Sequence, residues 1–273
     1  MLNRKLILLC GYARGGTNIA WNILQSHPNI CSPIFETGEI FRKSLRLRFF
    51  QKFGRFFDFK NTLDRELFSF KMRNLTHEDN KFKNPEETYT KIELENTALC
   101  LKSVNKYIYY SELIYKNHPN LYYIAITRNG YSLIDGYLRR GKKLSEVSEL
   151  YNAIYHENRR LSGIVKNFKI FKFEEILKDP FGISKQLYEF VQEEPFELDH
   201  LRFKAKKIIT SEGKHKVNFG DEDKKYWVDK SSIYHILDKD INKKQFERLD
   251  KNVIEEFNTL AGEAMKFYGY DLL

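Results

Sequence analysis

Cysteine, proline and long apolar runs are scarce in this chain of 273 residues, and each scarcity argues against a class of protein. The three cysteines, Cys10, Cys31 and Cys100, lack the spacing of metal ligands, so we expect buried thiols and no metal site. The first apolar run is far shorter than a membrane span, and no small-residue cleavage site follows it. We therefore expect no signal peptide and a reduced, cytoplasmic setting.

The six prolines form no linker, and the chain contains no internal repeat or low-complexity segment. Its length suits one large α/β domain, residues 1–273. The formal charge of +9 favours an anionic partner: nucleic acid, a membrane surface, a phosphorylated cofactor and an acidic glycan all fit. No helix-turn-helix or RNA-binding signature accompanies the charge, so we predict no specific nucleic-acid partner.

A strand, a glycine-rich loop and a helix are predicted in succession over residues 5–25. Residues 6–10 form an unbroken apolar run, three glycines and Arg14 follow, and apolar residues then recur at helical spacing. This order presents backbone N–H groups and a helix N-terminus to an anion. A phosphate-type ligand is predicted here, and the alternative is an ordinary glycine-rich connection.

The loop differs from that of a nucleoside triphosphatase, which reads G-x-x-x-x-G-K-[ST]. Gly11 and Gly16 have the required spacing, but Thr17 and Asn18 stand where the lysine and the hydroxyl residue belong. A metal–triphosphate site is therefore poorly supported.

Segments of strand length recur at residues 98–103, 121–127 and 168–173, separated by segments with helical spacing. This alternation is typical of right-handed βαβ units and a mainly parallel sheet. The clearest of these strands leads directly into Arg128, which is therefore expected at a strand end.

Two acidic residues follow the short strand predicted at residues 30–34. Glu36 and Glu39 would lie near the C-terminal end of that strand, where open α/β sheets bind ligands. They are general-base candidates. By position alone they fit better in the first turn of a helix, whose dipole they complement.

Residues 41–57 combine apolar and basic side chains. The apolar residues recur every three or four positions and predict one amphipathic helix; they are Phe41, Leu45, Phe49, Phe53 and Phe56. This segment either packs on the core with a solvated basic face or contacts an anionic acceptor, an acidic glycan or lipid headgroups. It begins a helical insertion, residues 41–96, expected over the acceptor side.

The last eighty residues are predicted to be helical and charged. Residues 208–223 are the longest irregular stretch, contain Lys214 and His215, and form a candidate lid loop. A helix over residues 243–268 should stop at Gly269.

Four separated stretches fit one pattern whose order and spacing cover most of the chain. They are residues 11–18 with Ser26-His27-Pro28, residues 127–130 with the helix after them, residues 173–180 and residues 268–270. Together they resemble the 3′-phosphoadenylyl-sulfate-dependent sulfotransferases, particularly the bacterial group related to carbohydrate and protein-tyrosine sulfotransferases. The resemblance implies a P-loop-like, three-layer α/β/α fold around a central, mainly parallel five-stranded sheet.

The resemblance also implies a nucleotide shared between the first loop and the arginine after the fourth strand. Arg128 would bind the 3′-phosphate, and Lys214 is assigned to the same nucleotide. The 5′-phosphosulfate would lie among residues of the first loop, namely Arg14, the backbone N–H groups of Gly15, Gly16, Thr17 and Asn18, and the Thr17 hydroxyl. The product would be 3′-phosphoadenosine 5′-phosphate, and no metal is required.

Catalytic roles follow from the same resemblance. Glu36 falls where protein-tyrosine and heparan-type members place their catalytic carboxylate and would act as general base, with Glu39 in reserve. Lys102 falls where many members carry a lysine at the transferring group, although by spacing alone it is an ordinary strand-end lysine. Lys102 and Arg14 would stabilise charge on the transferring and bridging oxygens.

Two departures from the family pattern concern the nucleotide. The family usually has a serine eight residues after the arginine that binds the 3′-phosphate, and here that residue is Gly136. Either Ser132, one helical turn earlier, substitutes for it, or the phosphate loses a donor. Ala13 and Gly15 replace a common proline and serine in the first loop.

The function implied is sulfuryl transfer to a hydroxyl group, with a sugar as the first acceptor class and a phenol or peptide tyrosine as the second. Two alternatives belong to other classes. One is a P-loop-type kinase, which the missing Gly-Lys-[Ser/Thr] disfavours. The other is a binder of anionic glycan or nucleic acid that keeps the fold without catalysis, which the missing serine permits.

Overall fold

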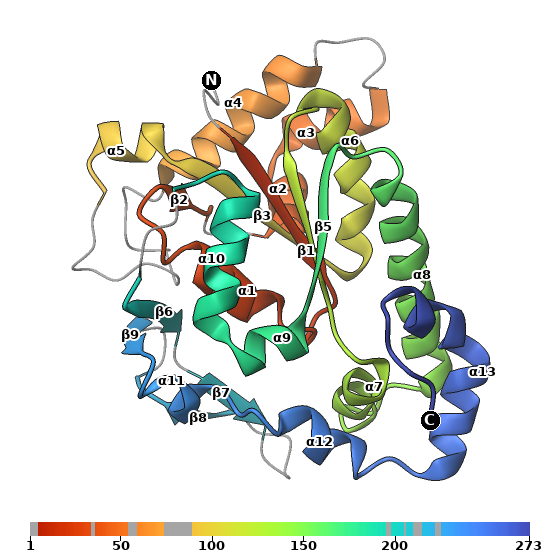
Figure 1. Ribbon diagram of the computed structural model, residues 1–273. Coiled ribbons are helices and arrows are strands. Elements are labelled where there is room, and N and C mark those ends of the chain that lie inside the picture. The colour runs from red at the N-terminus through yellow and green to blue at the C-terminus, as the bar shows by residue number, and fades with distance from the viewer. Residues whose placement is uncertain are drawn as a thin grey trace.

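The computed structural model describes residues 5–33, 36–53, 59–73, 89–194, 198–204, 206–209, 215–221 and 225–273. At its centre is a five-stranded sheet of order β2-β3-β1-β4-β5 (Figure 1). All neighbouring strands in it are parallel. The strands are β1 (Leu6–Gly11), β2 (Ile30–Cys31), β3 (Ala98–Val104), β4 (Tyr122–Thr127) and β5 (Asn167–Lys172). The predicted α/β fold with a five-stranded parallel sheet is confirmed.

Strand β1 supplies both faces of the sheet, which is why its apolar run is unbroken. Ile7 and Leu9 belong to the core on one face, and Leu6, Leu8 and Cys10 to the core on the other. Helices α1, α9 and α10 cover the first face, and α2, α4, α6, α8 and α13 contribute to the second (Figure 1). The helices on the first face are α1 (Thr17–Leu24), α9 (Phe173–Lys178) and α10 (Pro180–Phe190). Those on the second face are α2 (Thr37–Lys43), α4 (Phe59–Met72), α6 (Ser111–Asn117), α8 (Leu144–Ser162) and α13 (Lys251–Phe267).

The register of the central strands brings their ends together. Gly11 of β1 is level with Val104 of β3 and with Ile126 of β4. The segments that follow these three strands therefore meet at one edge of the sheet, called here the carboxyl edge. The loop after β1, the residues at the end of β3 and the turn after β4 come from distant parts of the sequence, yet they become neighbours.

The single helix predicted over residues 41–57 is wrong. Helix α2 ends before Ser44, whose extended backbone (φ −87°, ψ 108°) breaks the helical path, and α3 (Leu45–Phe53) begins afresh. The Ser44 hydroxyl accepts a hydrogen bond from the Leu47 N–H (3.1 Å), as an N-cap does.

This break changes which residues face the core. Leu47 is fully buried, whereas Leu45 and Phe49 of the predicted stripe are 75% and 49% exposed. Although the apolar spacing is continuous, Ser44 caps a new helix. The side chains after Ser44 therefore point in other directions than those of one continuous helix would. Phe56 of the predicted stripe lies outside the described residues. Helix α5 (Lys91–Asn96) follows, and the described residues between 41 and 96 are helical apart from short connections.

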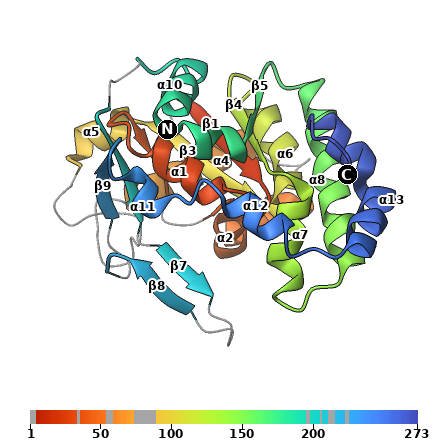
Figure 2. The ribbon, with the colours of Figure 1, turned by 60° about the horizontal axis from the view of Figure 1, so that its bottom comes forward.

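The last eighty residues contain strands that the sequence reading did not predict. Strands β6 (His200–Lys204) and β9 (Lys225–Asp229) pair antiparallel, and so do β7 (Lys206–Ile209) and β8 (His215–Phe219). Figure 2 shows the β7–β8 hairpin at the periphery of the molecule, and it is not paired with the central sheet. The expectation that residues 208–223 are irregular throughout was therefore wrong, because Ile208 and Ile209 belong to β7 and residues 215–219 form its partner β8. Lys214 lies outside the described residues.

The final segment contains two helices, not the one predicted. Helix α12 (Ile241–Phe246) is separated from α13, which begins after Asp250. Helix α13 packs against α8 (Figure 1). Gly269, with φ +71°, ends the chain's last helix as predicted: its N–H bonds to Lys266 O and the Tyr270 N–H to Met265 O.

Candidate functional site

The loop between β1 and α1 is held by hydrogen bonds from three sides. Asn105 Oδ1 accepts from the Ala13 N–H (2.8 Å), and the Tyr137 hydroxyl donates to Ala13 O (3.0 Å). Arg128 Nη1 donates to Arg14 O (2.8 Å). These contacts fix the loop backbone before any ligand binds, which is the preorganisation that an anion site requires.

Gly16 is needed at the end of this loop for two reasons. Its φ is +94°, and a Cβ there would lie only 2.2 Å from the ring of Phe173. Helix α1 starts at the next residue, so the N–H groups of Thr17 and Asn18 lie in its first turn without intrahelical acceptors. The Gly15 N–H was expected to face the ligand, but it donates instead to Tyr12 O (3.0 Å) within the loop. The side chain of Arg14 is exposed.

Glu36 and Lys102, to which the family resemblance gave separate catalytic roles, are in direct contact. Lys102 Nζ lies 2.7 Å from Glu36 Oε1 and also donates to Asn18 Oδ1. The Lys102 side chain is only 3% exposed, and its ammonium lies 4.2 Å from the centroid of the Trp21 ring. The Thr37 hydroxyl, next to Glu36, donates to Lys102 O (3.1 Å), so the start of α2 lies beside Lys102, near the end of β3.

The two neighbouring carboxylates have different surroundings. Glu36 is the N-cap residue of α2, and its carboxylate faces Lys102. Glu39 Oε2 accepts a hydrogen bond from the Glu36 N–H (3.2 Å), and its other oxygen lies 3.8 Å from Arg42. Glu39 therefore stabilises the start of α2, as an acidic residue in a first turn commonly does.

Arg128 lies at the carboxyl edge after β4 and is 6% exposed. Its Nε and Nη2 donate to Asn242 Oδ1 (2.9 and 2.5 Å), and Nη2 also donates to Gln245 Oε1. The guanidinium lies 4.7 Å from the centroid of the Phe173 ring. Burial lowers the pKa of Arg128 to about 10, so the group stays charged at neutral pH.

The partners of Arg128 in α12 were missed by the sequence reading. Asn242 and Gln245 belong to a charged helix more than a hundred residues away, and no motif marks them. Helix α12 packs against α7 (Gly130–Leu138), and this contact places them at the carboxyl edge. Ser132, the predicted substitute donor, is 2% exposed, and its hydroxyl donates to Asn242 O (3.2 Å).

The stretch at residues 173–180 has a structural role. Glu174 Oε1 accepts from the Asn129 N–H (3.0 Å) and from Asn242 Nδ2 (2.6 Å), and Oε2 accepts from the Tyr270 hydroxyl (2.7 Å). One carboxylate thus joins the turn after β4, α12 and the C-terminal segment. Asp179 caps α10 by accepting from the Gly182 N–H (2.9 Å), with a proline at the first helical position.

His27 is also structural. Its Nδ1 accepts from the Asn29 N–H (3.1 Å), which leaves Nε2 to donate to Glu194 O (3.0 Å). The sequence Ser26-His27-Pro28 therefore shapes the turn after α1. His215 is in β8, and its side chain lies outside the described residues.

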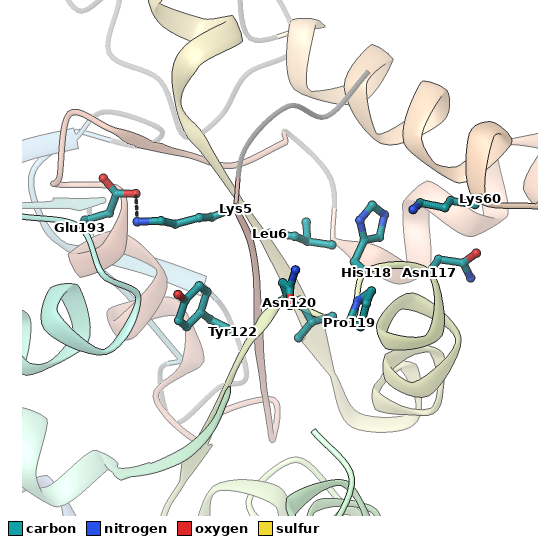
Figure 3. Close-up of a pocket in the computed structure, with 10 residues that line it drawn as sticks. Lys5, Leu6, Lys60, Asn117, His118, Pro119, Asn120, Tyr122 and Glu193 are labelled. Atoms are coloured by element: carbon teal, nitrogen blue, oxygen red, sulfur yellow. Dashed lines mark hydrogen bonds and ion pairs between the residues drawn. The ribbon is translucent and has the colours of Figure 1, made fainter. Parts of the chain in front are cut away.

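A cavity of about 670 Å³ lies at the opposite edge of the sheet, where β1 and β4 begin. Figure 3 shows Lys5, paired with Glu193 at 3.2 Å, at one end and His118 with Lys60 at the other. None of the predicted site residues lines it. The chemistry predicted from the sequence is gathered at the carboxyl edge, and the cavity lies elsewhere.

The histidine of this cavity predicts a pH dependence of stability. Burial lowers the pKa of His118, the carboxylate of Asp64 opposes this, and Lys60 acts with burial. The unfolded chain therefore binds a proton more readily, and the free energy of unfolding should fall as pH drops below the ordinary value of 6.5. Urea unfolding at pH 7.5 and 5.5 should show a smaller pH effect in His118→Gln than in wild type.

The exposed His156 provides the control for that measurement, since His156→Gln should keep the wild-type pH dependence. An unchanged pH effect in His118→Gln would contradict the assignment to His118.

Two findings concern the described residues alone. They include no group of three or more His, Cys, Asp or Glu side chains placed to hold a metal ion. None of their helices is both long enough and apolar enough to cross a membrane.

Two solved structures are similar to this chain over nearly its whole length. The sulfotransferase domain from the Synechococcus PCC 7002 olefin synthase gives a TM-score of 0.57 at 15% identity, covering 99% of this chain and 98% of that chain. The sulfotransferase domain from the curacin biosynthetic pathway gives 0.52 at 14% identity, covering 99% of each. At these identities the similarity concerns the fold, and it agrees with the parallel five-stranded sheet.

No curated protein matches this chain by sequence. The model of the sulfotransferase family matches residues 7–197, which is more than half of the chain. The matched region includes the loop after β1, Glu36, Lys102 and Arg128. The chain belongs to the sulfotransferase family.

Proposed function

We propose that this sulfotransferase uses 3′-phosphoadenylyl sulfate as donor and transfers the sulfuryl group to a hydroxyl of a carbohydrate or glycoconjugate. The observation that carries the proposal is the contact between Glu36, Lys102 and Asn18 at the carboxyl edge, beside the glycine-rich loop. A carboxylate, a buried ammonium and a helix N-terminus meet there. Proton removal, charge stabilisation and anion binding can therefore act on one reacting group.

The groups around the loop suit a doubly phosphorylated nucleotide. The first-turn N–H groups of Thr17 and Asn18 are donors, and Arg14 adds a positive charge beside them. Arg128 supplies a second, separate cation at the end of β4. Two positive centres on adjacent strand ends fit a ligand with phosphate groups at both ends of a ribose.

Each residue at the carboxyl edge has a defined task in sulfuryl transfer. When bound, the donor supplies the sulfuryl group and a phosphate leaving group. Glu36 takes the proton of the acceptor hydroxyl, and Lys102 places a positive charge where the transferring oxygens gain negative charge. The ion pair between them holds both side chains in position before the substrates arrive.

The surroundings of Glu36 favour a ring-shaped acceptor. A Cβ on Gly38 would lie 2.3 Å from the ring of Tyr107, so the glycine lets this ring pack against the first turn of α2. Tyr107 stacks with Tyr110, which stacks with Phe41 (centroids 6.3 and 4.2 Å apart). A half-buried aromatic ring beside the proposed base suits the apolar face of a sugar, and a phenol is the second choice.

Exposed basic side chains extend from this region along α2 and α3. These side chains are Arg42, Lys43, Arg46 and Arg48. Their positive charges favour an acidic glycan over a neutral sugar as acceptor. The same charges are compatible with an anionic membrane surface. Because the two similar domains come from an olefin synthase and the curacin pathway, hydroxyl groups of small biosynthetic intermediates belong in the same acceptor screen.

Saturating 3′-phosphoadenosine 5′-phosphate should raise the melting temperature, because a ligand that binds only the folded state stabilises it. Thermal unfolding with and without the nucleotide measures the shift. A shift with ATP and magnesium but none with this nucleotide would favour the kinase alternative. Binding without turnover of any hydroxyl acceptor would favour the non-catalytic glycan binder.

A further inference from the structure

The space beside Gly136 is bordered by two N–H donors. Gly136 lies among the buried residues of α7. A Cβ built on it would meet Gln245 Nε2 at 3.7 Å and Arg140 Nη1 at 3.8 Å. Apart from its two chain neighbours and the backbone of its own helix, no other described atom lies within 4 Å of that position. One donor belongs to a neutral amide and the other to a guanidinium.

Gln245 is oriented by Arg128. Its Oε1 accepts from Arg128 Nη2, so the amide nitrogen must point away from that guanidinium, towards Gly136. Gln245 is 5% exposed, and two contacts hold its helix, α12, and the residues after it against α7. The Ser132 hydroxyl holds the Asn242 carbonyl of the same helix, and Arg248 binds Asp135 of α7 through two N–H groups (3.1 and 2.7 Å).

Positive charge also accumulates at this place. Burial lowers the pKa of Arg140, and the nearby Arg14 and Arg139 lower it further, so these cations repel one another. Arg140 Nη1 also donates to the carbonyl of Gly136. The neighbouring carboxylate of Asp135 is already bound to Arg139 and Arg248. A bound anion would relieve the repulsion among the arginines.

We propose that Gln245 Nε2 and Arg140, together with Arg128, bind the 3′-phosphate of the donor nucleotide. The inference rests on the proposed function. Gln245 then supplies the donor that Gly136 cannot supply, and the absence of a side chain at position 136 leaves room for a phosphate oxygen. Ser132 does not contact the phosphate itself and acts indirectly, by holding α12 against α7.

The test uses the full chain and two nucleotides, 3′-phosphoadenosine 5′-phosphate and adenosine 5′-monophosphate, which differ only by the 3′-phosphate. Calorimetric titration should show that Gln245→Leu and Arg140→Ala each weaken binding of the first by about tenfold or more, as for a hydrogen bond to a charged group. Binding of the monophosphate should change by no more than about twofold. Gln245→Glu, which keeps an acceptor for Arg128, should lose still more affinity, because its charge repels the phosphate.

The matched control for Arg140 is Arg139→Ala, since the Arg139 Nε lies 3.2 Å from Asp135. It should weaken binding clearly less than Arg140→Ala. Gly136→Ser added to Gln245→Leu should recover part of the lost affinity, because its Cβ meets only ordinary contacts and its hydroxyl is a new donor.

Equal losses for both nucleotides would mean a purely structural role and would overturn the assignment. Unchanged binding of the bisphosphate in Gln245→Leu and Gln245→Glu, or equal effects of the two arginine variants, would overturn it as well. If wild type itself binds no 3′-phosphoadenosine 5′-phosphate, the proposed function fails first. Should Gln245→Leu not fold, Gln245→Glu and the exposed Arg140→Ala still decide the matter.

Discussion

Replacing Glu36 with glutamine should lower the turnover rate by about 10²–10⁴ and leave nucleotide affinity almost intact. Glutamine keeps the size of the side chain at the start of α2 but cannot accept the acceptor's proton. The groups proposed to bind the nucleotide lie on the loop after β1 and at the end of β4, and the Glu36 carboxylate is not one of them. Single-turnover rates with the acceptor found by screening, and nucleotide affinity by titration, measure the two effects separately.

Glu39→Gln is the matched control, because the two carboxylates lie three residues apart in the same turn. Glu39 holds the Glu36 N–H, so its loss should reduce stability or acceptor affinity and leave the rate of transfer largely unchanged. A rate loss in Glu39→Gln with a normal rate in Glu36→Gln would reverse the two roles. Normal rates in both would place the base elsewhere, and His215 would be the next residue to replace.

Replacing Lys102 with methionine should reduce the rate by about 10²–10³, the usual effect of removing one group that stabilises transition-state charge. Methionine keeps the apolar stem against Trp21 and removes only the ammonium. Because the Lys102 side chain is buried, water cannot take the place of the missing ammonium group. Single-turnover rates at saturating nucleotide are the measurement.

Lys116→Met serves as the control, since Lys116 is an exposed lysine whose ion pair with Glu112 lies away from the carboxyl edge. It should keep the wild-type rate. The double variant Glu36→Gln/Lys102→Met should show a non-additive loss, because the two groups are in contact. Additive losses would mean that the two residues act independently, and a normal rate in Lys102→Met would refute its role in charge stabilisation.

Much of the central sheet was predictable because its local signals agree with its tertiary environment. The unbroken apolar run of β1, the run before Arg128 and the alternation with helices all follow from strands buried on both faces. The same topology requires strand ends to share one edge, so a site near Arg14, Lys102 and Arg128 could be expected from order along the chain. The family resemblance gave Glu36 and Lys102 their expected roles, and only the structure shows the contact between them.

The break at Ser44 shows how local patterns mislead. Phe41, Leu45 and Phe49 recur at helical spacing, but a serine able to cap a second helix ended the first. The strands of the late segment show a different limit. A short strand has no independent stability, and β6 and β9 are separated by some twenty residues that no sequence period connects.

The sequence by itself therefore determined the parallel sheet, the glycine-rich loop after β1 and the edge at which the predicted site residues of β1, β3 and β4 meet, because these depend on apolar runs, glycines and strand order. Only the tertiary structure decided which groups surround Arg128 and Gly136. Asn242 and Gln245 reach them from α12 through the packing of α12 on α7. Such a contact depends on side chains that meet across more than a hundred residues, and no local propensity records it.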